Sequence, residues 1–140
     1  MNQGELLSAF LIDLQRIFRT KIVPKELSYS QALSILVIPD DGIEMSELAW
    51  VMGLENSTVT RLIGRLESNG FVKREKSEVD KRSIIVFLKS KGIKIQKNIE
   101  KKSDEIGQEI FQNDTDIQKE TILENLSLFQ WALKKTFLKR

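Results

Sequence analysis

The chain has 140 residues, 41% of them hydrophobic, which is the size and composition of a single domain with a real core. It contains no cysteine and no histidine, which excludes disulfides, thiol redox chemistry, the commonest general base and soft metal ligands. We also find no phosphate-binding glycine motif, so an enzyme, a cofactor and a bound metal are not expected. Acidic residues interrupt the N-terminal apolar residues, and no apolar run approaches the roughly 20 residues of a membrane span. We therefore expect a cytoplasmic protein without membrane contact.

Two helices are predicted before residue 40. In the first, apolar residues recur at helical spacing as far as about Lys21, and Pro24 follows. This apolar stripe consists of Leu7, Phe10, Leu11, Leu14 and Phe18. Ser28 and Gln31 have the spacing of a capping box, which predicts a second helix that continues through Ile38.

Residues 45–69 have the spacing of a helix-turn-helix motif. Ala49 leaves room for a second helix to cross closely, and Gly53 can adopt the left-handed conformation that ends the first helix. Apolar residues fall where the core between the two helices needs them, at Leu48, Met52, Leu54, Val59 and Leu62.

The second helix of this motif, residues 56–69, separates an apolar face from a polar one. The apolar stripe has i, i+3, i+4 and i+7 spacing and comprises Val59, Leu62, Ile63 and Leu66. Hydroxyl and guanidinium groups can bond to base edges in a DNA major groove. The candidate DNA-binding residues here are Ser57, Thr58, Thr60, Arg61 and Arg65. An ordinary solvated helix face is the alternative, and Gly64 argues only mildly against it.

A β-hairpin is predicted after Gly70, where the hydrophobic period changes from 3.6 to 2. Residues 71–75 and 82–88 form its strands, and the polar run 76–81 forms its tip. The candidate DNA-binding residues of the hairpin are Lys73, Arg74, Lys76, Lys81 and Arg82. Asp80 could orient the Arg82 guanidinium through a charge-assisted hydrogen bond. The alternative is that this pair only stabilises the hairpin.

Two further helices are predicted towards the C-terminus. Regularly spaced isoleucines mark the fifth helix, at Ile95, Ile99, Ile106 and Ile110. Thr115 with Gln118 predicts the cap of a sixth helix. Its apolar stripe comprises Ile122, Leu126, Phe129, Leu133 and Phe137.

The first and last helices carry more apolar surface than one core can cover. The residues that lie off the main stripes are Leu6, Ile12, Leu128, Trp131 and Leu138. A symmetric homodimer would provide the second buried face that they need. A thicker core within a monomer is the alternative.

Positive charge is concentrated on the segment that carries the DNA-binding candidates. Residues 56–94 contain ten basic and four acidic residues, a net charge of +6, whereas the chain as a whole carries +2. The remainder is therefore net negative, and the distribution is typical of a nucleic-acid-binding protein.

These residues resemble a known family. The segment from Asp80 to Leu88, DKRSIIVFL, resembles the D-x-R-x-x-x-V-x-L signature in the wing of MarR-type winged-helix regulators. Residues 57–72, STVTRLIGRLESNGFV, are similar to that family's recognition helix and first wing strand. There are two departures. Lys89 replaces the usual threonine, which moves the expected cap of the next helix to Ser90. Trp50 occupies a usually charged position, where it packs near Pro39 or meets a partner.

The resemblance implies a mainly α fold with a small β wing. It places a winged helix-turn-helix DNA-binding region at 28–92 and helical dimerisation regions at 1–22 and 93–140, within a single chain of residues 1–140. It also implies that the recognition helix enters the major groove and that Arg82 reaches the adjacent minor groove. Family members often bind small phenolic or other aromatic ligands in a crevice. The matching residues here, which are otherwise plain core, are Phe10, Leu14, Leu33 and Val37.

The sequence therefore predicts a homodimeric transcriptional regulator, a repressor on a pseudo-palindromic operator in double-stranded DNA, with release by a small aromatic ligand. A protein of another class remains as the alternative. This is a winged-helix interaction module that binds another regulator and makes little use of its basic surface.

Overall fold

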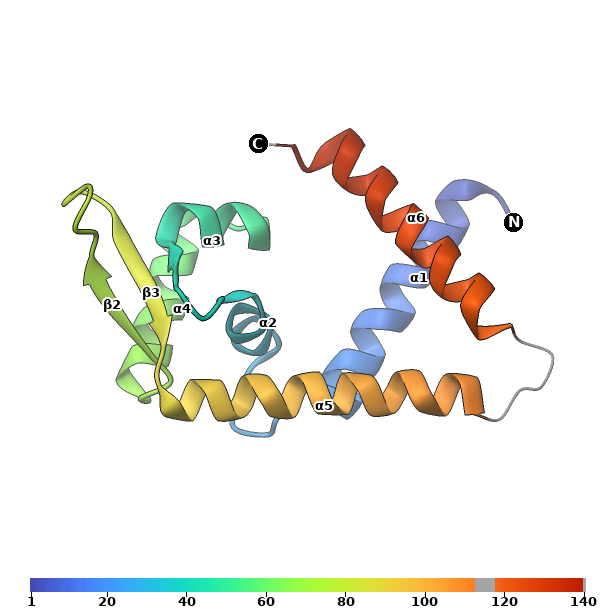
Figure 1. Cartoon of the computed structure of the whole chain (residues 1–140), viewed down its shortest axis with the longest axis horizontal. Helices are drawn as coiled ribbons and strands as arrows, with labels where there is room; N and C mark the ends of the chain where they lie inside the picture. Colours follow the sequence, from blue (N-terminus) through green and yellow to red (C-terminus); the bar gives the residue numbers. More distant parts are fainter. Residues whose placement is uncertain (113–117, 140) are drawn as a thin grey trace. The chain divides into compact units, whose positions relative to one another are not determined.

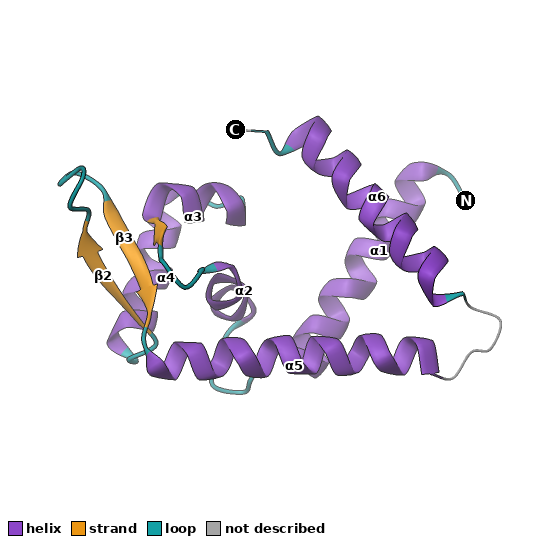
Figure 2. Cartoon of the chain, in the orientation of Figure 1, coloured by secondary structure: helices purple, strands orange, loops and turns teal. Residues whose placement is uncertain are grey.

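The computed structural model describes residues 1–112 and 118–139, and the chain divides into two units, Met1–Ser103 and Asp104–Arg140. The first unit contains α1 (Gln3–Ile17), η1 (Phe18–Ile22), α2 (Tyr29–Val37), β1 (Ile43–Glu44), α3 (Met45–Met52), α4 (Asn56–Ser68), β2 (Val72–Lys76) and β3 (Ile84–Leu88). Figure 1 labels these α-helices and the two longer strands. Helix α5 (Ser90–Gln112) begins in the first unit and continues into the second, which also contains α6 (Lys119–Phe137). The mainly helical fold with a small β wing is confirmed (Figure 2).

The two N-terminal helices begin at capping boxes. The Ser28 side chain accepts from the Gln31 backbone N–H, and the Gln31 side chain accepts from the Ser28 N–H, as the sequence predicts. A second box at Asn2 and Glu5 opens α1 and was not predicted. Helix α1 continues into η1, a turn of π-helix that ends at Ile22 and has Val23 as its C-cap, directly before Pro24.

The core of the first unit lies between α2, α3, α4, the sheet and the start of α5. Its fully buried apolar side chains are Ile35, Ile38, Leu48, Val59, Ile63, Leu66, Val72, Val86 and Ile99. Gln96 of α5 donates to the carbonyl oxygens of Ile35 and Ile38 at 2.9 and 2.8 Å. Helix α5 therefore caps the C-terminal end of α2, whose last carbonyls would otherwise lack a partner.

The helix-turn-helix has the predicted boundaries. Helix α3 ends at Met52, and its C-cap is Gly53, whose φ of 66° is in the left-handed region. The Leu54 backbone N–H then donates to the Ala49 carbonyl at 3.0 Å. Ala49 is only 3% exposed, so its small side chain lies inside the motif, as predicted.

The sheet is antiparallel with strand order β1-β3-β2. Its two long strands begin and end within one or two residues of the predicted hairpin, with Arg74 opposite Val86. Strand β1 was not predicted, because a two-residue strand has no periodicity to detect.

One of the two predicted caps towards the C-terminus can be compared with the structure. The Lys89 N–H donates to the Phe71 carbonyl, while the Lys89 carbonyl already accepts from Ile93. Ser90 is therefore the first helical residue of α5 and not its cap, so that prediction is wrong. The predicted cap at Thr115 lies outside the described residues, and α6 follows Gln118.

Helix α6 presents a large apolar surface within its own unit. Its exposed large apolar residues, together with Leu138 just beyond its end, are Leu123, Leu126, Leu128, Phe129, Trp131, Leu133, Phe137 and Leu138. Among the helices of residues 1–112 and 118–139, none combines the length and hydropathy that crossing a membrane requires.

Candidate nucleic-acid interface

Helix α4 separates its two faces as the sequence predicts. Val59, Ile63 and Leu66 are fully buried, which fixes the opposite side of the helix towards solvent. On that side Ser57, Thr60, Arg61 and Arg65 are exposed, and Thr58 is partly buried. The Thr60 hydroxyl donates to the Asn56 carbonyl at 2.8 Å, so its oxygen keeps the capacity to accept a hydrogen bond from a base or a bridging water.

A tight network of hydrogen bonds closes the tip of the wing. The Ser77 hydroxyl oxygen lies 3.3 Å from the backbone nitrogens of both Val79 and Asp80. The backbone N–H groups of Ser77 and Ser83 donate to the carbonyls of Ser83 and Asp80, respectively, each at 2.9 Å. Ser77 is 8% exposed, whereas Val79 at the tip is 98% exposed. The wing therefore has an ordered frame from which exposed side chains project.

Asp80 differs from its predicted role. Its Oδ1 accepts from the backbone N–H of Arg82 at 3.0 Å, and among the described residues no ion pair joins it to the Arg82 guanidinium. An aspartate two residues before an N–H forms such a local turn readily, since its short side chain can reach only the nearby backbone. Asp80 therefore orients the wing through the backbone, and the predicted direct bond to the guanidinium is wrong.

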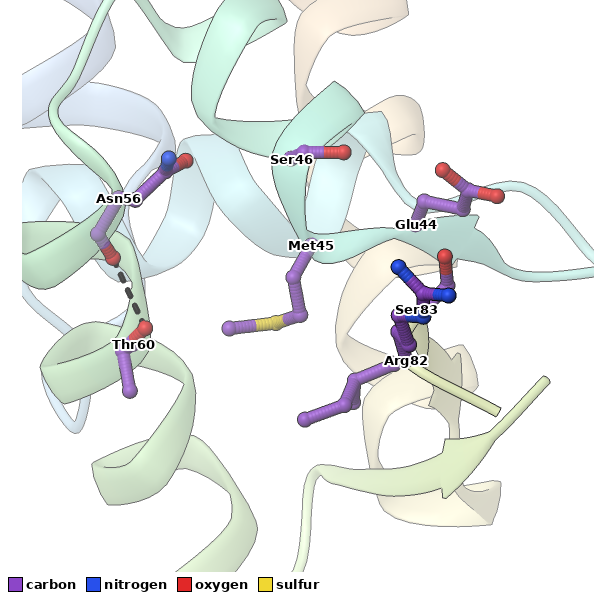
Figure 3. A pocket seen from close by; sticks show the side chains of 8 residues that line it. Glu44, Met45, Ser46, Asn56, Thr60, Arg82 and Ser83 are labelled. Carbon is purple, nitrogen blue, oxygen red and sulfur yellow. Dashed lines mark hydrogen bonds between the residues drawn. The ribbon is translucent and has the colours of Figure 1, made fainter. Parts of the chain in front are cut away.

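The wing and α4 meet at one surface hollow of about 230 Å³ (Figure 3). Arg82 from the wing and Thr60 from α4 both line it, so the two predicted DNA-binding elements face the same side of the unit. The other lining residues are Glu44, Met45, Ser46, Asn56, Ser83 and Ile84.

A second hollow, of about 430 Å³, lies between α2 and α4. From α4 it is lined by Thr58, Arg61, Leu62 and Arg65, and from α2 and the turn of the motif by Ser28, Ser30, Gln31 and Leu54. The two exposed guanidiniums of α4 therefore border the α2 side of the helix, and Thr60 borders the wing side.

Arg74, a predicted contact residue, has a hydrogen-bond partner within the chain. Its backbone N–H donates to Glu67 Oε2 at 2.9 Å, and its Nε and Nη2 donate to Glu67 Oε1 at 3.2 and 2.9 Å. The guanidinium is thus bound within the chain, and Arg74 joins β2 to the last turn of α4. Its side chain is 30% exposed and its fork is occupied by Glu67, so Arg74 has a structural role here, and its contact with DNA stays a prediction.

Glu67 is a functional candidate that the sequence analysis missed. The hydrogen bonds from Arg74 hold the pKa of its carboxyl below the usual value, so it remains charged at neutral pH. The sequence contains a signal that could have revealed Glu67. It is an acidic residue in the last turn of a predicted helix, followed by a basic residue, Arg74, in the next predicted strand.

Lys91 is the second missed residue. Its Nζ donates to the carbonyl of Asn69, the C-cap of α4, at 2.8 Å and lies 4.2 Å from the centre of the Phe71 ring. A cation at the C-terminal end of a helix offsets the helix dipole and satisfies a free carbonyl. Helix α5 thereby holds the end of α4.

The remaining basic candidates of the wing are exposed. Lys76, Lys81 and Arg82 are open to solvent. Lys73 forms an ion pair with Glu75 at 2.9 Å, with both side chains 52% exposed, so solvent screening leaves this pair weak. These four residues remain candidates for contact with phosphate.

The candidate ligand residues lie on two helices of the first unit. Phe10 and Leu14 of α1 are 42% and 50% exposed, and Leu33 and Val37 of α2 are partly buried. Neither hollow described above includes any of the four. Trp50 on α3 is 41% exposed.

The chain is similar to known transcriptional regulators in sequence and in fold. A sequence profile of the MarR family matches residues 40–84. The chain is 31% identical over 110 residues to the uncharacterized HTH-type transcriptional regulator YfiV of Bacillus subtilis, covering 78% of this chain and 69% of that protein. It is 35% identical over 78 residues to the HTH-type transcriptional regulator TtmR of Methylorubrum extorquens, covering 55% of this chain but only 40% of that protein.

Solved structures show the same fold along nearly the whole chain. A MarR transcriptional regulator from Methanosarcina mazei superposes with a TM-score of 0.76 at 29% identity, covering 95% of this chain and 97% of the other. FabT of Streptococcus pneumoniae, solved in complex with DNA, superposes with a TM-score of 0.76 at 21% identity, covering 97% of this chain and 96% of the other.

Proposed function

The chain belongs to the MarR family of transcriptional regulators, which are not enzymes, and from that premise we propose that it binds double-stranded DNA as a homodimer and represses transcription from a pseudo-palindromic operator. In this proposal α4 enters the major groove and the wing reaches the neighbouring minor groove. A repressor bound in this way blocks access of RNA polymerase to the promoter. The protein acts in the cytoplasm, where bacterial-type operators are found.

One observation carries the DNA-binding part of the proposal. Thr60 of α4 and Arg82 of the wing line the same hollow, so a duplex lying against α4 would also meet the wing at Arg82. The net charge of +6 over residues 56–94 supports the same surface, because positive charge attracts the phosphate backbone irrespective of sequence. That FabT was solved with DNA supports the proposal by likeness of fold.

Dimerisation is supported by the apolar side chains that each unit leaves uncovered. On α1 these include Leu6, Leu7, Leu11 and Ile12, all at least 49% exposed. An apolar surface of this extent in a monomer would favour association. A two-fold dimer predicts operator half-sites about one helical turn, roughly 10 bp, apart.

We also propose that a small aromatic ligand releases the repressor, through the region of Phe10, Leu14, Leu33 and Val37. The exposed Phe10 ring and Leu14 side chain support this, since they offer apolar area for a ligand to cover. Titrating a small aromatic acid into the protein–DNA complex should lower its fluorescence anisotropy, and Phe10→Ala should raise the ligand concentration required. The same response in both proteins would contradict this location for the site.

The central test measures binding to duplex DNA from upstream of the protein's own gene, by gel shift and by anisotropy at several salt concentrations. If the dimer makes about 6–10 phosphate contacts, affinity should fall by roughly 10³–10⁵ between about 50 and 200 mM salt. Absence of binding, or a flat salt response, would instead favour an interaction module that binds another regulator.

A further inference from the structure

The last turn of α4 and the first strand of the wing are joined by one side-chain connection, which we call the Glu67–Arg74 clasp. Both oxygens of Glu67 take part: Oε2 accepts the Arg74 backbone N–H, and Oε1 accepts two N–H groups of the guanidinium fork. An arginine that binds a carboxylate with two donors is fixed in direction as well as in distance. The clasp therefore constrains the angle between helix and strand, not merely their separation.

The backbone between these two elements is a short turn. Gly70 has a φ of 81°, its N–H donates to the Glu67 carbonyl at 3.0 Å, and the Phe71 N–H donates to the Leu66 carbonyl at 3.0 Å. The turn sets where β2 begins. The clasp acts four residues beyond Gly70, at Arg74, and therefore fixes the direction in which β2 continues.

The position of Arg74 within the sheet extends this constraint to the wing tip. Arg74 lies opposite Val86 in the central part of the β2–β3 ladder, and Lys76 pairs with Ile84 at its far end. The tip that carries Arg82 is the direct continuation of these paired strands, and its hydrogen bonds leave it little freedom. A rotation of β2 about the turn would therefore displace Arg82 relative to Arg61.

We propose that Glu67 is a positioning residue that sets the spacing between the α4 contacts and the wing contact and thereby determines how well the protein discriminates its operator from other DNA. This inference rests on the proposed DNA-binding function. When two contacts are held at a fixed spacing, the second forms as an intramolecular event once the first has formed. Only a sequence that offers both contacts at that spacing gains this advantage, whereas phosphate contacts are available on any duplex.

The charge of Glu67 makes the proposal easy to test. When the carboxylate is removed, electrostatics and geometry predict opposite changes in the affinity for the operator. Removing a carboxylate near DNA should, by charge alone, raise affinity for every duplex. Loss of positioning should lower affinity for the operator and leave random DNA unchanged or bound slightly more tightly. The low pKa of the Glu67 carboxyl means that the clasp is ionised throughout the pH range of such a measurement.

The experiment compares dissociation constants of the full-length wild type, Glu67→Ala, Arg74→Ala and the double variant on a footprinted operator and on a random duplex of equal length. We expect the ratio of operator to random affinity to fall by roughly 5- to 20-fold in each single variant. The double variant should be little worse than either single one, since either change alone opens the clasp.

The chain offers a matched control on the same strand. Glu75 also forms an ion pair with a basic neighbour, Lys73, but both residues belong to β2, and this ion pair does not connect β2 to α4. Glu75→Ala removes the same charge and one ion pair, so it should raise operator and random affinity alike and leave their ratio unchanged. If Glu75→Ala lowered the ratio of operator to random affinity as much as Glu67→Ala does, the proposal would be overturned.

A second measurement tests the spacing directly. In the wild type, Arg61→Ala and Arg82→Ala should each reduce the free energy of operator binding, and the two reductions should be coupled, because each contact helps the other to form. In the Glu67→Ala background the two losses should become additive. Unchanged coupling in that background would contradict a positioning role.

Other outcomes are also decisive. If Arg74→Ala weakens random-duplex binding and lowers the salt slope while Glu67→Ala does not, Arg74 contacts phosphate itself and the proposal is wrong. If the wild type shows no preference for any duplex, the proposed function fails before this inference is reached. Thermal unfolding of each variant checks the fold, and Glu67→Gln, which keeps the side-chain shape and one acceptor, should give an intermediate ratio if Glu67→Ala is too unstable to measure.

Discussion

At the scale of single residues, the wing depends on a local backbone contact. The Asp80 carboxylate accepts from the Arg82 backbone N–H at 3.0 Å, and the Ser83 N–H donates to the Asp80 carbonyl at 2.9 Å. Asp80 therefore shapes the turn from which the Arg82 side chain departs. An amide can replace a carboxylate in such a turn, because both present an acceptor oxygen at the same position.

This contact separates two roles for Asp80 experimentally. We expect Asp80→Asn to retain most of the operator affinity, because the turn needs an acceptor and not a charge. Asp80→Ala should weaken operator binding, and Arg82→Ala should weaken it further by removing the contact itself. Arg82→Lys should recover only part of the operator affinity that Arg82→Ala loses, since a point charge cannot reproduce a planar fork in a narrow groove. Anisotropy titrations at one salt concentration provide the measurement.

The controls follow from the structural alternative. If Asp80 and Arg82 only stabilise the hairpin, Asp80→Ala and Arg82→Ala should lower the melting temperature together with operator binding. Arg82→Lys should then retain the wild-type melting temperature and operator affinity. If Asp80→Asn loses as much affinity as Asp80→Ala, the carboxylate charge is required after all and the turn interpretation is wrong.

Glu67 predicts a pH dependence of stability. Hydrogen bonds from Arg74 lower the pKa of its carboxyl in the folded chain relative to the ordinary value of 4.5. A lowered folded-state pKa stabilises the protein above the unfolded value, and this contribution is lost as pH falls through the folded value. The wild type should therefore exceed Glu67→Gln in melting temperature at neutral pH, and the difference should shrink as pH drops below about 4.5.

Circular dichroism melts of the two proteins between neutral and acidic pH test this difference. Subtracting the variant removes the contribution of every other carboxylate from the comparison. Because the Glu67 side chain is 37% exposed, solvent screens the pair and we expect a modest difference. A difference that stays constant across the acidic range would show that the clasp stabilises the fold without its charge.

At the scale of elements, α5 lies in very close contact with the beginning of β2. A Cβ at Gly92 would lie 2.2 Å from the backbone oxygen of Phe71, which cannot move without disturbing the Phe71–Lys89 hydrogen bond. Lys91, one residue earlier, bonds the end of α4. The first turn of α5 thus fixes both the recognition helix and the wing at their shared turn.

Two glycines of α5 give a matched pair of variants. Gly92→Ala should destabilise the protein by about 1–3 kcal/mol, because the added methyl overlaps backbone. Gly107→Ala has nothing within 4 Å of the new Cβ and should stabilise the helix by about 0.5–1 kcal/mol. Urea unfolding of both variants measures the free energy of unfolding, which should fall in Gly92→Ala and rise in Gly107→Ala. A Gly92→Ala protein as stable as the wild type would contradict the close approach.

At the scale of the whole molecule, both units leave apolar side chains exposed. Sedimentation velocity at micromolar concentration should show a dimer, and replacing Leu126 and Trp131 by glutamate should shift it towards monomer and weaken operator binding. Both side chains are exposed on α6, at 43% and 56%, so the change leaves the fold of the first unit intact while placing charge on a surface that we expect to be buried in the dimer.

The control places the same charge elsewhere on the surface. Val79 is 98% exposed at the wing tip, and Val79→Glu should leave the oligomeric state unchanged. A wild-type chain that sediments as a stable, soluble monomer would contradict the argument from exposed apolar surface. The predicted spacing of the operator half-sites would then need revision.

Much of the fold could be predicted because its signals are local. The capping box at Ser28, the left-handed turn at Gly53 and the two faces of α4 all depend on residues no more than about two helical turns apart. A regular period therefore specifies which face of a helix is buried without knowledge of what covers it. The change of period after Gly70 likewise predicted the hairpin.

Local sequence patterns specify these elements and the set of side chains that α4 exposes, whereas the partners of the polar groups depend on how distant segments fold together. Arg74 appears among the exposed basic candidates in sequence, yet the turn at Gly70 brings Glu67 within 2.9 Å of it. Gln96 bonds carbonyls 58 and 61 residues away. A hydrogen bond depends on distance and direction to within a few tenths of an ångström, and those are set by how the chain folds back, not by the order of its residues.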